Sequence, residues 1–90
     1  MRFEWDPKKA ATNLKKHRVT FQEAATVFGD PLAITFQDPD HSMDEERELT
    51  FGQSLQKRLI VVSHTERKNR TRIISARLME HKERVIYEEG

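Results

Sequence analysis

Residues 58–78 have the sequence RLIVVSHTERKNRTRIISARL. Two runs rich in β-branched residues, at about 58–66 and 70–78, flank the short polar segment 67–69. So short a connection favours an antiparallel β-hairpin, because parallel strands need a much longer crossover. The stretch therefore predicts two neighbouring strands of one sheet.

Alternating patterns upstream predict further strands at about 32–37 and 46–53. The segment from Gly52 to Lys57 is again short enough for an antiparallel hairpin. Asp38-Pro39-Asp40 and the residues up to Glu45 predict a loop before the second of these strands. Residues 2–5 alternate as well and predict a short strand that ends at Asp6-Pro7.

Capping signals predict three helices. Asp6 can cap a first helix that has Pro7 at its first position and runs to about His17. Thr20 and Glu23 have the spacing of a capping box for a second helix, which Gly29-Asp30-Pro31 ends. The tail from about Glu80 to Glu89 predicts a closing helix. The pattern as a whole predicts an α+β fold.

The alternation of side chains predicts two different faces of the sheet. The odd positions are mostly apolar and are expected to meet the helices: Leu49, Phe51, Leu59, Val61 and Ile73. Arg47, Ser63, Ser75 and Arg77 share this parity but are expected near the strand ends. The even positions are polar at one end and aliphatic in the middle, at Ile60, Val62 and Ile74. We expect this even face to be open or covered by a partner.

The composition excludes several classes of protein. Ninety residues are enough for one domain, 1–90, and too few for two. The chain has no cysteine, which removes disulfides and thiolate chemistry. It has neither a long apolar segment nor a signal-peptide pattern, so we expect a cytoplasmic protein without membrane contact. There is no P-loop, GxGxxG or GxSxG motif, and no cofactor is expected.

Charge is distributed unevenly along the chain. Residues 31–56 hold one Lys or Arg against six Asp or Glu, whereas residues 57–90 hold nine against five. The basic segment 67–72 is therefore a candidate polyanion-binding patch. The alternative is a solvated hairpin turn. Metal binding is weakly supported, because Asp38, Asp40, Asp44 and Glu45 lack the spacing of a calcium-binding loop.

Hairpin turns near residues 55 and 68 would place Glu46, His64 and Arg72 in one row across three strands. An acid, an imidazole and a guanidinium side by side suit RNA cleavage without a metal. Glu46 or His64 could take the 2′-hydroxyl proton, His64 could protonate the leaving oxygen, and Arg72 or Arg77 could hold the phosphate. Arg67, Lys68 and Arg70 would bind the RNA backbone. The same row could equally be a surface ion network, and a register slip of one residue would destroy it.

Several short blocks are spread over nearly the whole chain. They are Phe3-Glu4-Trp5-Asp6-Pro7, Asn13 with Lys16-His17, Val19-Thr20-Phe21, Ala24-Ala25 with 27–31, Asp44-Glu45-Glu46-Arg47, 72–77, and finally Glu83 and Tyr87-Glu88-Glu89. Together and in this order, the blocks closely resemble the BrnT family of type II toxin–antitoxin toxins. The resemblance implies a RelE-like fold, with a small antiparallel sheet, two N-terminal helices and a C-terminal helix. It also implies a ribonuclease that inhibits translation and a cognate BrnA-type antitoxin with a ribbon-helix-helix region.

The family motifs transfer in part. Arg72 and Arg77 match basic positions of the family, and Glu46-Arg47 match its acidic-basic pair, which adds Arg47 to the candidate RNA-binding residues. RelE-type sites are generally rich in Lys and Arg, which favours the arginines over His64. Arg18 stands where relatives usually have Gly, and would add about 1 kcal/mol of strain in a left-handed turn. Glu80 stands where Thr commonly caps the last helix, so a loose helix start is expected.

We therefore expect an endoribonuclease toxin that cleaves RNA without a metal. An antitoxin segment or the C-terminal helix could cover the apolar residues of the even face. We expect the antitoxin to bury this face or its rim and to cover the basic residues. Operator DNA would be bound only through the toxin–antitoxin complex. Two alternatives remain: a nucleic-acid- or partner-binding module without catalysis, and a purely structural subunit of the repressor complex.

Overall fold

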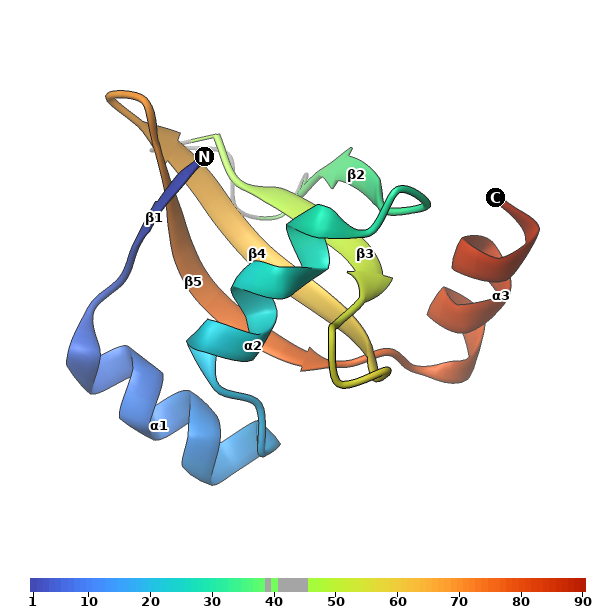
Figure 1. Cartoon of the computed structure of the whole chain (residues 1–90), viewed down its shortest axis with the longest axis horizontal. Coiled ribbons are helices and arrows are strands. Elements are labelled where there is room, and N and C mark those ends of the chain that lie inside the picture. The colour runs from blue at the N-terminus through green and yellow to red at the C-terminus, as the bar shows by residue number, and fades with distance from the viewer. Residues whose placement is uncertain (39, 41–45) are drawn as a thin grey trace.

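The computed structural model describes residues 1–38, 40 and 46–90 (Figure 1). The helices are α1 (Pro7–His17), α2 (Phe21–Thr26) and α3 (His81–Glu89), and a 3-10 turn, η1 (Val27–Gly29), follows α2. The strands are β1 (Arg2–Glu4), β2 (Ile34–Gln37), β3 (Glu48–Gln53), β4 (Leu59–Arg67) and β5 (Arg70–Leu78). The predicted α+β class and the three helices are confirmed. The loop predicted between β2 and β3 includes residues 39 and 41–45, which lie outside the described residues.

The five strands form one sheet in the order β1-β5-β4-β3-β2. Strands β2 to β5 are antiparallel neighbours, as predicted. The sheet is nevertheless mixed, because β1, at its edge, pairs in parallel with β5. The chain leaves β1 through α1 and α2, reaches the far edge at β2 and returns strand by strand, so the first and last strands finally lie side by side (Figure 1).

The predicted cap of α1 is confirmed, whereas the predicted capping box of α2 is formed only in part. Asp6 accepts a hydrogen bond from the backbone N–H of Lys8 at 2.8 Å, and Thr20 Oγ1 accepts one from that of Glu23 at 3.0 Å. The Glu23 carboxylate does not return to Thr20. It accepts hydrogen bonds from Arg58 and from Ser54 Oγ instead, so it ties α2 to the β3–β4 turn.

The chain turns left-handed after α1 at Arg18, the residue for which the sequence comparison with the family raised this conformation. Arg18 has φ 60° and ψ 31°, and its backbone N–H donates to Leu14 O at 2.9 Å. A residue with a Cβ atom is strained in this conformation by about 1 kcal/mol relative to glycine.

The prediction of which sheet face meets the N-terminal helices is wrong. Ile60 and Val62, at even positions, are fully buried in one cluster with Phe21 and Ala24 of α2. Val61, at an odd position, lies on the opposite face and packs with Phe51. Both faces of β4 carry branched apolar side chains, so alternation could not decide between them. The even face is therefore not open to an antitoxin at Ile60 and Val62.

A β-bulge in β5 is a second reason why the residues on each face of the sheet differ from the predicted sets. Ser63 pairs with Ser75, but His64 pairs with Ile73, so Ile74 is the extra residue. The bulge changes the parity of β5, and Ile73 and Ala76 consequently join the same core cluster. It also fixes which face each arginine of β5 occupies.

Helix α3 packs on the face opposite to α1 and α2. Tyr87 contacts the cluster of Phe51, Val61 and Met79. Its hydroxyl donates to Asp30 Oδ2 at 2.5 Å, and burial with this hydrogen bond raises the pKa of Tyr87 to about 12. At the other end of α3, Glu83 Oε1 accepts from the backbone N–H of Glu80 at 2.8 Å, so the helix start is fixed despite the absence of Thr.

Candidate nucleic-acid interface

The β4–β5 hairpin carries basic side chains at its tip. Lys68 and Asn69 occupy the turn with φ values of 46° and 69°. Two successive left-handed residues match the right-handed twist of the strands and give a tight two-residue turn. The turn places Arg67 directly opposite Arg70. The turn therefore brings together three of the predicted RNA-binding residues, Arg67, Lys68 and Arg70.

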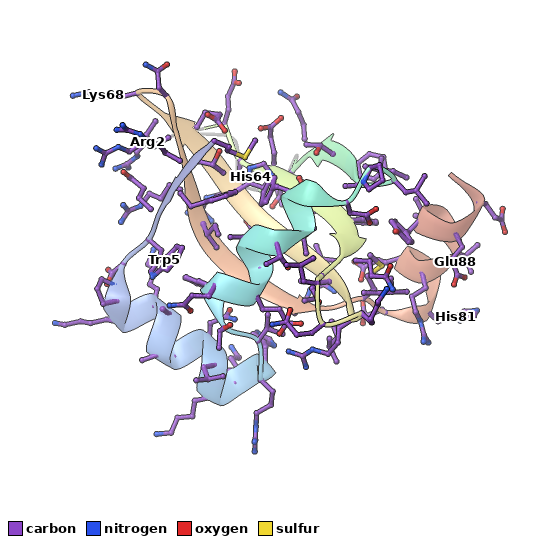
Figure 2. The ribbon with its side chains drawn as sticks, viewed as in Figure 1. Arg2, Trp5, His64, Lys68, His81 and Glu88 are labelled. Atoms are coloured by element: carbon purple, nitrogen blue, oxygen red, sulfur yellow. The ribbon has the colours of Figure 1, made fainter. Side chains whose placement is uncertain are left out.

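The N-terminal strand adds two charged residues to this hairpin. The parallel pairing of β1 with β5 places Arg2 beside Arg70 and Glu4 beside Arg72. The labelled side chains of Arg2 and Lys68 both lie at the hairpin end of the molecule (Figure 2). We call Arg2, Arg67, Lys68, Arg70 and Arg72, together with Glu4, the basic end.

Two surface hollows lie at the basic end. One is lined by Glu4, Arg67, Lys68 and Arg70. The other is lined by Met1, Arg2, Lys68, Asn69 and Arg70. Guanidinium groups around a hollow can donate paired hydrogen bonds to phosphate oxygens, so the arrangement suits a nucleic-acid backbone.

Glu4 bridges the two arginines of β5. Its Oε2 lies 3.1 Å from Arg72 Nη1, and its Oε1 lies 3.5 Å from Arg70 Nη1. The hydrogen bond from Arg72 is the strongest influence on the pKa of Glu4, and together with Arg70 it lowers that pKa below the ordinary value. Glu4 is therefore an ionised carboxylate that is shared between two cations.

The strand register places Arg77 away from the basic end. Arg72 pairs with Thr65 and Arg77 pairs with Val61, so both arginines lie on the α3 face of the sheet. Five residues of strand separate them by roughly 15 Å. Arg77 donates from Nη1 and Nη2 to the two carboxylate oxygens of Glu83, each at 2.7 Å. The structure therefore does not bring Arg72 and Arg77 together.

The predicted row of Glu46, His64 and Arg72 is wrong. His64 pairs with Glu48 on β3 and with Ile73 on β5, so the register differs from the predicted one on both sides. His64 points toward the face covered by α2 and η1, where its ring lies 4.9 Å from that of Phe28. Arg72 occupies the other face.

The environment of His64 is that of a core residue. The side chain is only 3% exposed. Its Nε2 lies 2.7 Å from Thr50 Oγ1, which in turn lies 2.8 Å from Thr35 Oγ1. Its Nδ1 has no hydrogen-bond partner among the described residues. Burial lowers the pKa of His64, and the charge of Glu66 only partly opposes this effect.

Burial of His64 predicts a pH dependence of stability. The pKa of His64 in the folded protein lies below the unfolded value of about 6.5, so the unfolded chain binds the proton more readily. The free energy of unfolding should therefore fall as the pH drops below about 6.5, by at most about 1.4 kcal/mol per pH unit from this residue.

Urea unfolding of the wild type and of His64→Gln between pH 7.5 and 5 checks this prediction. The difference between the two proteins isolates His64 from the carboxylates, which titrate at lower pH. Wild type should lose more stability than the variant over this range. Equal losses would mean that His64 is not held neutral by burial.

Glu46 and Arg47 lie just before β3, at the hairpin end of the sheet. The backbone carbonyl of Glu46 accepts a hydrogen bond from Thr65 Oγ1 at 2.7 Å. Because Thr65 pairs with Arg72, the Glu46 backbone lies one strand away from that arginine. Glu46 is exposed and Arg47 is half-buried. The carbonyl of Arg47 accepts from the N–H of Asp38 at 2.8 Å.

The described part of the chain contains no cluster of potential metal ligands. Residues 1–38, 40 and 46–90 contain no cluster of three or more His, Asp or Glu side chains that could hold a metal ion. Two of the acidic residues considered above for metal binding, Asp44 and Glu45, lie outside this part of the chain. Within it, no helix is long and apolar enough to cross a membrane.

Sequence reasoning missed two residues of the basic end, Arg2 and Glu4. The alternation of residues 2–5 predicted a strand, and both side chains are on it. The missing information was the partner of that strand, because a pairing between residues 4 and 72 leaves no local signal.

Comparison with known proteins gives the fold and the family of the chain. A search of curated proteins finds no match. Among solved structures, the ribonuclease toxin BrnT of Brucella abortus superimposes with a TM-score of 0.71 and 23% sequence identity, over 90% of this chain and 99% of that one. The two proteins therefore share a fold. Residues 5–83 match the family model described as "Ribonuclease toxin, BrnT, of type II toxin-antitoxin system". The chain belongs to the BrnT family of ribonuclease toxins of type II toxin–antitoxin systems.

Proposed function

We propose that this protein is an endoribonuclease that cleaves RNA at the basic end without a metal ion. The observation that carries the proposal is the convergence of four arginines and one lysine from β1, β4, β5 and the hairpin turn. A ribonuclease needs positive charge near the phosphate that becomes pentacoordinate. Fixed guanidinium groups can supply that charge, so the site does not require a metal for it.

The residues of the basic end are proposed to have different roles. Arg72 is the phosphate-stabilising residue, because it is half-buried and is held by Glu4 at 3.1 Å. Arg70 assists it, and Arg2, Arg67 and Lys68 hold the neighbouring phosphates of the RNA strand. Arg77 lies five residues further along β5 than Arg72, where it binds Glu83, and is not part of this proposed phosphate site.

Glu46 is the proposed general base. It is exposed and lies just before β3, and its backbone is bound by Thr65, the residue that pairs with Arg72. His64 has the better intrinsic pKa for proton transfer, but its burial under Phe28 argues against contact with RNA. Arg47 precedes β3 at the same end and is proposed to contact the RNA backbone.

Cleavage of cellular RNA would inhibit translation and would take place in the cytoplasm. We propose a BrnA-like antitoxin with a ribbon-helix-helix region as the partner. A region of this kind binds DNA, so the operator would be reached only through the complex. The charge of the basic end favours an antitoxin that covers it with acidic side chains. A complex in which Arg70 and Arg72 stay accessible to RNA would contradict this partner surface.

Incubation of the antitoxin-free protein with RNA in EDTA tests the proposed activity. We expect cleavage products to form at an undiminished rate when EDTA is present. Separation of products on a denaturing gel, beside a mock purification that lacks the toxin, measures this. RNA that stays intact but is bound in a salt-sensitive manner would favour a binding module without catalysis. Loss of cleavage in EDTA, restored by Mg²⁺, would overturn metal independence alone.

A further inference from the structure

Glu4 is the acidic residue at the centre of a cationic site. Its two carboxylate oxygens face different arginines, Arg70 and Arg72, from the neighbouring strand. A carboxylate between two cations at an RNA site lowers the local positive charge, which by itself weakens the attraction of phosphate. Its presence there therefore needs a physical explanation.

General-base catalysis is a poor explanation for Glu4. The two arginines already occupy its oxygens, and they lower its pKa, which makes the carboxylate a weaker proton acceptor. A positioning role fits the geometry better. Arginine side chains have several rotatable bonds, and Arg70 is 52% exposed while Arg72 is 29% exposed. Without a fixed acceptor, both guanidinium groups would occupy many rotamers.

We propose that Glu4 is a positioning residue that holds the guanidinium groups of Arg72 and Arg70 in the orientation that grips the scissile phosphate of RNA. This inference rests on the ribonuclease activity proposed above. Strand β1 supplies a rigid support for Glu4, because its backbone is hydrogen-bonded to β5 alongside the two arginines. A preorganised donor stabilises charge in the transition state without first having to be ordered.

A purely neutralising or structural role for Glu4 predicts the opposite kinetic result. If Glu4 merely cancels charge or fastens β1, removal of its charge frees two guanidinium groups for RNA. Binding would then tighten, and cleavage would stay constant or increase. If Glu4 positions the arginines, binding is kept or tightened in the same way, but kcat falls. The two roles are separated by kcat and not by affinity.

Glu4→Gln is the informative variant, because it keeps the side-chain shape and removes the charge. We expect kcat for cleavage of a short RNA to fall on the order of tenfold. The Kd for the same RNA with a 2′-deoxy group at the cleavage position should stay constant or decrease. A kcat equal to or above that of wild type would overturn the proposal.

Glu66→Gln is the matched control. Glu66 lies on β4 near the same hairpin, but it pairs with Thr71 on the opposite face and accepts a hydrogen bond from Thr71 Oγ1 at 2.6 Å. The variant removes the same charge from the same end of the sheet and should leave kcat unchanged. An equal loss of kcat in both variants would mean that the net charge, and not the bridge, sets the rate.

A double-mutant cycle keeps the test valid if Glu4→Gln also lowers stability. In the Arg72→Ala background, Glu4→Gln should cause a much smaller further loss of kcat, since one of its two targets is absent. Additive losses would overturn the positioning role. A wild-type protein that cleaves no RNA would instead refute the proposed activity, which these variants do not address.

Discussion

Replacement of Arg72 with alanine is expected to lower kcat for RNA cleavage by about 10²- to 10³-fold. Removal of one preorganised donor to a developing negative charge typically has an effect of this size. Arg72 is the less exposed of the two arginines that Glu4 binds, at 29%, so its guanidinium is the better fixed. Single-turnover cleavage of a short RNA with excess protein measures the chemical step directly.

Two further variants show whether the geometry or the charge of Arg72 matters. Arg72→Lys keeps the charge but loses the planar fork, and should recover only part of the rate. Arg84→Ala removes a similar charge from an exposed position on α3, far from the basic end, and should cleave at the wild-type rate. Full activity of Arg72→Ala would remove the phosphate-stabilising role from this residue.

Local sequence signals predicted most of the secondary structure. Asp6-Pro7 marked the start of α1, Thr20 capped α2, and the short segment 67–69 gave the β4–β5 hairpin. Each of these signals acts over a few residues, because caps and tight turns are fixed by backbone hydrogen bonds between near neighbours. Basic residues concentrated at such a turn are necessarily neighbours, so part of the candidate site was predicted as well.

The incorrect predictions about the sheet depend on contacts between distant segments. The bulge at Ile74 shifts the parity of β5 by one residue, and no local pattern marks it. The apolar residues on both sides of β4 belong to two different cores, one under α2 and one under α3, so alternation could not assign the faces. The same limitation explains the failure of the predicted row that contained His64.

Strand β1 shows most clearly why the site itself was incomplete. Glu4 and Arg72 are 68 residues apart in the sequence. Their contact depends on a parallel pairing that joins the first strand of the chain to the last. Such a pairing follows from the whole topology, whereas sequence patterns report on neighbouring residues. The contacts of Glu4 with Arg70 and Arg72 therefore became apparent only in the structure.

Asn13→Asp is expected to destabilise the protein by about 3–5 kcal/mol, against a total stability of roughly 5–13 kcal/mol for a chain of this length. Asn13 is 6% exposed and connects three segments. Its Nδ2 donates to Val19 O at 2.9 Å and to Ala76 O at 2.8 Å, and its Oδ1 accepts from Ala76 N at 3.0 Å. A carboxylate keeps only the acceptor, faces two carbonyl oxygens and buries a charge.

Urea unfolding monitored by circular dichroism measures the loss, with Thr12→Ala as the control. Thr12 is the exposed neighbour of Asn13 on α1, and its replacement should change the free energy of unfolding by less than about 0.5 kcal/mol. Protonation would give the introduced carboxyl group a hydroxyl donor, so the difference from wild type should be smaller at pH 5 than at pH 7. A difference below about 1 kcal/mol at pH 7 would mean that α1 and β5 are held together without this amide.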